Sequence, residues 1–154
     1  MKKIYMAGKL FSQADQAQRQ KEYDLLVEIN EELGVDYEVY SPIHAPINDK
    51  SKLPSALDVF NGDEKELMES SVVFADLADE DPGVMMELGM VLLEDIRVYA
   101  YLSDIRIGTS GEYNGIYVPF GYNQFVIGSL EKYFGKVYLS FEEALEAYKE
   151  DIIK

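Results

Sequence analysis

Short apolar segments alternate with helix-like segments along this chain, and that order is the strongest constraint on its fold. The apolar segments are nearly continuous in hydrophobic character, which is typical of strands buried on both faces of a sheet. Five of them occur, at residues 4–7, 37–40, 72–77, 98–102 and 137–139. The alternation predicts a single α/β domain over residues 1–154, with a doubly wound, five-stranded parallel sheet of the flavodoxin or Rossmann type.

Residues that start and stop helices stand between these strands. Ser12, with Asp15 three residues later, predicts an N-terminal cap, and Gly34 predicts the end of that first helix. Ser140 and Glu143 form the same capping pattern ahead of the last helix, which is expected to reach about residue 152. The remaining helices are expected at 63–70, 82–93 and 125–133, with a long loop over 41–53 and a glycine-rich segment over 103–121.

Charge and composition restrict the kinds of molecule and metal that this protein is expected to bind. The chain carries 29 Asp and Glu against 14 Lys and Arg, a formal net charge of -15, so we expect neither a nucleic-acid groove nor a membrane-binding surface. It has no Cys and a single His, His44, which argues against thiolate or histidine metal sites. No signal peptide and no apolar span of roughly 20 residues is recognised. We therefore expect a cytoplasmic protein whose chemistry rests on carboxylates, hydroxyls and amides.

One carboxylate interrupts the apolar face of the helix expected at 82–93. Counted at helical spacing, that face holds Val84, Glu87, Leu88, Val91 and Leu92. Burying an ionised carboxylate costs several kcal/mol unless it is paired or hydrogen-bonded. Two interpretations follow. Either Glu87 lies at the edge of the stripe and reaches solvent, or it is positioned at the ligand-binding end of the sheet as a nucleophile, base or acid.

Other polar residues at the expected carboxyl ends of the strands also have structural interpretations. Asp81 followed by Pro82 matches a helix N-cap and first helical position. The acidic run 79–81 is interpreted as a solvated loop rather than a Mg²⁺ site. Tyr5 lies inside the first strand; its hydroxyl needs a partner if it is buried, and Glu87 is a candidate. No glycine spacing typical of phosphate-cradling loops is present, so use of nucleoside triphosphates is not expected.

Three stretches of the sequence resemble one enzyme family, the nucleoside 2-deoxyribosyltransferases. Residues 4–11, IYMAGKLF, are similar to the family's opening IYxAGxxF strand and turn. Residues 61–63, NGD, are similar to its NxD ahead of the third strand. Residues 73–77 and 81–89, VFADL and DPGVMMELG, are similar to its D.G...ELG signature. The resemblance extends from about residue 3 to residue 148.

The resemblance implies an activity and a set of catalytic residues. The reaction would be transfer of a 2′-deoxyribosyl group from one nucleobase to another with retention at the anomeric carbon, without a metal or organic cofactor. Glu87 would be the nucleophile that forms a glycosyl–enzyme ester, and Tyr5 would hold its carboxylate. Asp63 would serve the departing and arriving base as proton donor or anchor. The partners would be small-molecule deoxynucleosides and free bases.

The resemblance also implies substrate-binding residues, some of them shared between copies of the chain. Asp81 would hold the sugar hydroxyl end. Gly8 and Phe11 belong to the substrate-binding turn after the first strand, with Phe11 against the base. The family commonly completes its sites with an Asn from a neighbouring subunit; Asn123 is the match here, with Asn114 as the alternative. We therefore expect a homo-oligomer, a hexamer or a dimer, with shared active sites.

Physical chemistry agrees with these roles and leaves two alternatives open. A cationic, oxocarbenium-like transition state is stabilised by an anionic pocket containing Glu87, Asp63 and Asp81. The 2′-deoxynucleoside 5′-monophosphate N-glycosidases resemble this chain in the Tyr and the ELG helix. They tend to have Ser where Asp81 stands, because a phosphate is bound there. A non-catalytic nucleoside-binding module is the other alternative, and it predicts binding without turnover.

Overall fold

Four parallel strands form the sheet in the computed structural model, which describes residues 2–46, 53–104, 112–113, 116–117 and 122–154. In spatial order the strands are β2 (Tyr37–Tyr40), β1 (Lys2–Ala7), β3 (Val72–Asp76) and β4 (Arg97–Tyr101). The chain winds outward from β1 to β2 and then crosses to β3 on the other side. Ala7 pairs with Ala75, so the carboxyl ends of β1 and β3 lie side by side at this switch point, where ligands of open α/β sheets bind.

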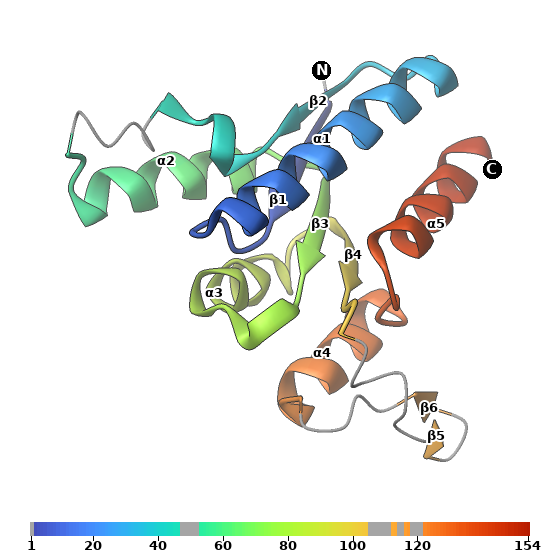
Figure 1. Ribbon diagram of the computed structural model, residues 1–154. Helices are drawn as coiled ribbons and strands as arrows, with labels where there is room; N and C mark the ends of the chain where they lie inside the picture. Colours follow the sequence, from blue (N-terminus) through green and yellow to red (C-terminus); the bar gives the residue numbers. More distant parts are fainter. Residues whose placement is uncertain (1, 47–52, 105–111, 114–115, 118–121) are drawn as a thin grey trace.

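Helices cover both faces of the sheet (Figure 1). One face is covered by α1 (Gln13–Leu33) and α5 (Phe141–Ile153), the other by α2 (Ala56–Met68), α3 (Pro82–Val91) and α4 (Gln124–Phe134). Residues alternate between the two cores along β1: Ile4 and Met6 join the α1 side, and Tyr5 and Ala7 join the α2–α4 side. Tyr5 therefore points toward the layer that contains Glu87.

The prediction of a fifth strand at 137–139 is wrong. Tyr138 alone of these residues pairs with β4, through one parallel bridge to Tyr101. Its N–H donates to the Ala100 carbonyl oxygen at 2.9 Å, and its carbonyl oxygen accepts from the Leu102 N–H at 2.9 Å. Gly135 ends α4 and Ser140 caps α5, so residues 136–139 form a short connection between the two helices. The segment extends the β4 edge by one contact only.

A short pair of antiparallel strands was not predicted. Within the glycine-rich segment, β5 (Glu112–Tyr113) and β6 (Ile116–Tyr117) pair as antiparallel strands. Two-residue strands carry too little hydrophobic pattern to be recognised in a sequence.

The α2 helix begins earlier than predicted. The Ser55 side chain accepts from the Asp58 N–H at 3.1 Å, and the Asp58 carboxylate accepts from the Ser55 N–H at 3.0 Å. This capping box starts the helix at Ala56 rather than at residue 63. Asp63 consequently lies well inside α2, where a helical side chain has a more fixed direction than one in a loop.

The predicted caps of the first helix are confirmed, and that of the last helix is confirmed in half. Both hydrogen bonds of the Ser12 capping box form, and Gly34 ends α1 in the left-handed conformation with φ of 64°. Ser140 accepts from the Glu143 N–H at 3.1 Å. The Glu143 carboxylate accepts instead from the Leu139 N–H, so the reciprocal bond of the box does not form.

Candidate active site

The Glu87 carboxylate is hydrogen-bonded to a fully buried tyrosine. Glu87 is partly buried on α3, in the same helical stripe as the buried residues Val84 and Leu88. The Tyr5 hydroxyl donates to Glu87 Oε1 at 2.6 Å, and Tyr5 is 0% exposed. The expected partner of the Tyr5 hydroxyl is therefore confirmed. The carboxylate faces the end of the sheet and does not extend into bulk solvent.

A second tyrosine–carboxylate pair lies beside the first. Tyr40, the last residue of β2, donates its hydroxyl to Asp63 Oδ1 on α2 at 3.0 Å. Tyr40 and Tyr5 are paired across β2 and β1, and their rings stack with centroids 5.4 Å apart and an interplanar angle of 27°. Sequence reasoning missed Tyr40. Its place at the carboxyl end of a predicted strand does not by itself indicate the contact with Asp63.

Burial governs the protonation of both carboxylates. It raises the pKa of Glu87 to about 7; the Tyr5 hydrogen bond opposes this rise, and the negative charges of Asp63 and Asp81 add to it. Burial also raises the pKa of Asp63, against the hydrogen bond from Tyr40. Burial and the Glu87 charge raise the pKa of Tyr5 far above its ordinary value, so Tyr5 stays a donor to the carboxylate. Near neutral pH, Glu87 is present in both charged and neutral forms.

Asp81 caps α3, as the Asp-Pro sequence predicts. Its Oδ2 accepts from the Gly83 N–H at 3.0 Å and from the Val84 N–H at 3.1 Å, and Pro82 occupies the first turn. The cap fixes the Asp81 side chain at the positive end of the helix dipole, which favours a carboxylate there.

The turn that precedes Asp81 is strained. Asp79 and Glu80 have φ of 59° and 50°, in the left-handed region that residues with side chains rarely adopt. Contacts from two other segments hold this turn. Lys9 forms an ion pair with Asp79, and the Glu80 carboxylate accepts from the Asn123 N–H at 3.2 Å. Because contacts from several sides hold this strained turn, the Asp81 that follows it has a fixed position.

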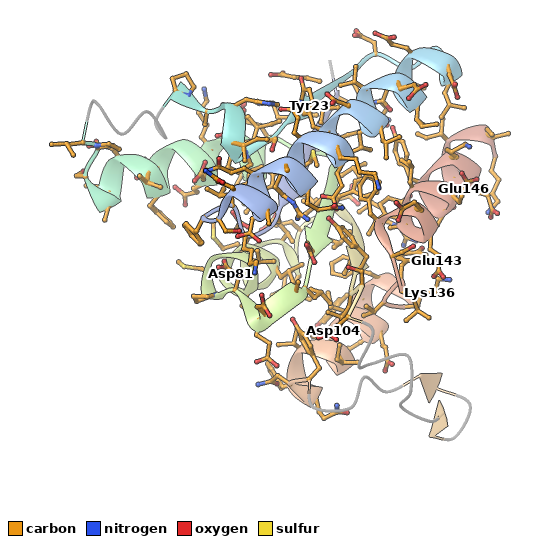
Figure 2. All side chains as sticks on the ribbon, viewed as in Figure 1. Tyr23, Asp81, Asp104, Lys136, Glu143 and Glu146 are labelled. Carbon is orange, nitrogen blue, oxygen red and sulfur yellow. The ribbon has the colours of Figure 1, made fainter. Side chains whose placement is uncertain are left out.

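A cavity of about 210 Å³ lies where these elements meet. It is bordered by the turn after β1, and Figure 2 shows Asp81 at the start of α3 next to that turn. Its wall brings together most of the residues that the sequence predicts for the site: Gly8, Phe11, Asp63, Asp81 and Glu87.

A larger, mostly apolar cavity of about 360 Å³ lies between α2 and α3. It shares Asp63 and Glu87 with the first cavity, so these two carboxylates line both spaces. The apolar wall includes Phe60, Leu67 and Met86.

Packing beneath the smaller cavity requires glycine at position 8. A Cβ on Gly8 would lie 1.9 Å from Arg19 Nη1. Arg19 is 3% exposed and donates to Asp76 Oδ2 at 2.6 Å and to Glu22 Oε1 at 3.1 Å. The Tyr101 hydroxyl donates to the other Glu22 oxygen at 2.9 Å. This buried ion-pair network ties α1 to the end of β3; sequence reasoning missed it.

The structure does not bring Asn123 into the site of its own chain. Asn123 is exposed and caps α4, accepting from the Phe125 and Val126 N–H groups, and it lines neither cavity. Asn114, the alternative, lies outside the described residues. A contribution of Asn123 to a neighbouring copy stays a prediction.

The described ranges contain neither a metal-binding cluster nor a membrane-spanning helix. No group of three or more His, Cys, Asp or Glu side chains is arranged there to hold a metal ion. None of the helices described combines the length and the apolar character needed to cross a bilayer. His44 is exposed and contacts Gln20 Oε1 at 2.8 Å, with its ring against the edge of Tyr23, and it lines neither cavity.

The chain is similar to known proteins over most of its length. A family model described as nucleoside 2-deoxyribosyltransferase matches residues 4–119. A conserved protein from Enterococcus faecalis V583 is 29% identical, with 98% of this chain and 99% of that chain covered and a TM-score of 0.78. No match was found among curated proteins.

Two further solved structures share the fold at lower identity. A 2-desoxiribosyltransferase from Leishmania mexicana is 22% identical, with 97% of this chain and 98% of that chain covered and a TM-score of 0.65. A CMP N-glycosidase from Clostridium botulinum is 16% identical, with 97% and 99% covered and a TM-score of 0.55.

Proposed function

The chain belongs to the nucleoside 2-deoxyribosyltransferase family, and on that premise we propose that it transfers the 2-deoxyribosyl group of a nucleoside to a free base. The reaction proceeds through a covalent ester on Glu87. One observation carries the proposal: the partly buried Glu87 carboxylate, held at 2.6 Å by the Tyr5 hydroxyl, lies in the wall of a cavity at the switch point of the sheet.

In the first displacement, Glu87 attacks the anomeric carbon of the bound nucleoside. The Tyr5 hydroxyl engages Oε1, so Oε2 forms the bond to C1′. The bond from C1′ to the base nitrogen breaks, and its electron pair goes to the base. Attack requires the ionised carboxylate, and a pKa of about 7 supplies it in a substantial fraction at neutral pH.

Asp63 supplies the proton that the departing base needs. It lines the same cavity as Glu87, and burial raises its pKa, which favours a retained proton beside a charged neighbour. In the second displacement, the acceptor base attacks C1′, its proton passes to Asp63, and Glu87 leaves as a carboxylate. Two inversions give net retention.

Negative charge around the anomeric carbon stabilises the cationic transition state. Glu87, Asp63 and Asp81 all line the cavity, and Asp81 is anchored there by its cap. Because Asp81 Oδ2 accepts from the helix amides, Oδ1 receives the sugar hydroxyl. Phe11, 78% exposed beside the same cavity, provides a flat apolar surface for the base.

Hydrolysis of a nucleoside 5′-monophosphate is the second candidate. The observation that favours it is a cation, Lys9, in the wall of the cavity, where it could meet a phosphate. Lys9 is, however, already paired with Asp15 and Asp79, and Asp81 would repel a phosphate in the same space. We therefore favour a nucleoside substrate and an acceptor base over a nucleotide and water.

We also propose that copies of the chain associate, as a hexamer or a dimer, with Asn123 of one copy entering the site of another. Asn123 is exposed and lines no cavity of its own chain, which is what a residue serving a neighbour requires.

The deciding experiment supplies deoxyinosine or thymidine together with free adenine and separates the products by chromatography. New deoxyadenosine supports transfer, whereas free base and free sugar support hydrolysis. The same incubation with deoxyinosine 5′-monophosphate tests the second candidate. Turnover of neither donor, with ligand binding retained, would leave a non-catalytic nucleoside-binding module.

A matched pair of variants assigns the reaction to Glu87. Glu87→Ala should abolish exchange, and without an acceptor the wild type should carry a deoxyribosyl adduct on Glu87 by mass spectrometry. Glu146→Ala is the control, because Glu146 lies on α5, far from Asp81 (Figure 2), and lines neither cavity. Full exchange by Glu87→Ala would contradict the mechanism.

A further inference from the structure

Tyr40 connects the two halves of the proposed catalytic apparatus. It is the residue of β2 that pairs with Tyr5 of β1, so both side chains leave neighbouring strands on the same face of the sheet. Its ring stacks on that of Tyr5, and its hydroxyl donates to Asp63 Oδ1 at 3.0 Å. It therefore contacts both the residue that holds the nucleophile and the residue proposed to protonate the base.

We propose that Tyr40 is a positioning residue that determines which oxygen of Asp63 carries the proton delivered to the base. This inference rests on the proposed function. A hydroxyl that donates to Oδ1 makes that oxygen an acceptor in both charge states of the carboxyl. When Asp63 is protonated, its proton therefore lies on Oδ2. The base receives it from the one oxygen that Tyr40 leaves free.

The surroundings of Asp63 make this contact important. Besides Tyr40, three acidic or hydroxyl groups lie near enough to interact electrostatically with Asp63: Glu66 on its own helix, Glu87 from α3 and Tyr5 from β1. None of these brings a positive charge. The hydrogen bond from Tyr40 is thus the contact that favours the ionised form of Asp63, the form that must accept a proton in the second displacement.

The ring of Tyr40 has a separate task. Stacked at 5.4 Å, it covers one face of the Tyr5 ring and limits how the Tyr5 hydroxyl can be directed at Glu87. The two tasks can be separated by substitution. Tyr40→Phe keeps the stacked ring and removes only the bond to Asp63, whereas Tyr40→Leu removes both.

Two donors distinguish protonation of the base from attack on the sugar. Deoxyinosine needs a proton on its leaving base. In 7-methyl-2′-deoxyguanosine the base is already cationic and leaves as a neutral molecule. The measurement is single-turnover release of base without acceptor, which reports the first displacement alone. The control is Tyr148→Phe, whose hydroxyl donates to Asn30 Oδ1 in the core on the other side of the sheet.

Tyr40→Phe is expected to slow release from deoxyinosine by about tenfold to a hundredfold, the range for a hydrogen bond to a charged group, and to slow the methylated donor by less than about twofold. Tyr40→Leu should slow both donors, and the control should slow neither. Equal losses for both donors in Tyr40→Phe, or no loss for either, would overturn the proposal.

A second readout does not depend on turnover. The carboxyl titration of Asp63, followed by ¹³C NMR and assigned with Asp63→Asn, should move to higher pH in Tyr40→Phe because a bond to the ionised form is lost. An unmoved titration would overturn the proposal even if the enzyme is active. Absence of base release from either donor by the wild type would instead count against the proposed function, and the titration would still test the contact.

Discussion

Removing the Tyr5 hydroxyl isolates its effect on the charge of Glu87. Tyr5→Phe deletes one oxygen and keeps the ring that stacks on Tyr40. The Tyr5 hydrogen bond lowers the Glu87 pKa that burial raises, so its loss should move that pKa further above about 7. The ionised nucleophile then requires a higher pH, and the acidic limb of the rate profile should shift upward.

The size of the shift follows from the contact. A hydrogen bond to a charged group contributes about 1.5–3 kcal/mol, and about 1.4 kcal/mol corresponds to one pKa unit, so the limb should move by about one to two pH units. With a pKa of about 7, wild-type Glu87 is roughly half ionised at pH 7. In the variant only about 1–10% would be ionised, so the rate at pH 7 should fall about five- to fiftyfold and recover at higher pH.

Single-turnover release of base, measured from about pH 5 to about pH 10, tests this expectation. Tyr99→Phe is a suitable control because the Tyr99 hydroxyl donates to Asp151 on the opposite face of the sheet. A uniform loss at every pH, with the limb in place, would show that Tyr5 orients Glu87 without setting its charge. A limb that moves downward would refute the electrostatic reasoning altogether.

Three further predictions follow from the packing and charge of the site. Glu87→Gln removes a carboxyl group whose pKa is ordinarily 4.5 and is about 7 in the folded protein. Because the folded protein holds this proton more tightly than the unfolded chain, the free energy of unfolding of the wild type decreases as the pH rises from about 4.5 to about 7. Urea unfolding should show the variant up to about 3 kcal/mol more stable at pH 8 and similar at pH 4. Gly8→Ala, which collides with buried Arg19, should lose about 1–3 kcal/mol of stability, whereas Gly62→Ala, with nothing within 4 Å of its Cβ, should not. If active sites are shared between chains, co-expression of the Glu87→Ala and Asn123→Ala chains should restore the exchange activity that each variant lacks alone, because a mixed oligomer contains a site with both residues intact. No restored activity would count against shared sites.

The sequence was informative where a local pattern was strong. Glu87 was found because an acid stood in an apolar helical stripe, and Asp81 because Asp-Pro marks a helix start; the structure places both in the wall of one cavity. The start of α2 was missed although Ser55 and Asp58 spelled out a capping box. That signal was present and could have been used.

Residues whose role depends on distant partners could not be found in this way. Tyr40 looked like any strand tyrosine, because its partner Asp63 is 23 residues away and on another element. Arg19 carries no local sign of its role either, because its partner Asp76 is 57 residues away. The fifth strand failed for a different reason: three apolar residues have the composition of a strand, but of these only Tyr138 pairs with β4, through a single bridge.

The geometry of the site depends more on the buried network than on the ion pair at its surface. Two left-handed residues, Asp79 and Glu80, cost about 1–2 kcal/mol each, whereas the exposed ion pair from Lys9 is screened by solvent and contributes little. Lys9 alone therefore cannot hold the turn. Asp76 is the last residue of β3. Its Oδ1 accepts from the Ala78 N–H, at the start of the turn, at 3.0 Å, and its Oδ2 accepts from Arg19. Removing one partner of a buried pair of this kind costs about 3–5 kcal/mol, because the other charge is left buried and unpaired, so the pair keeps its geometry. Through the bond from Arg19 to Asp76, α1 therefore helps to position the turn that leads to the α3 cap, and with it the sugar end of the site.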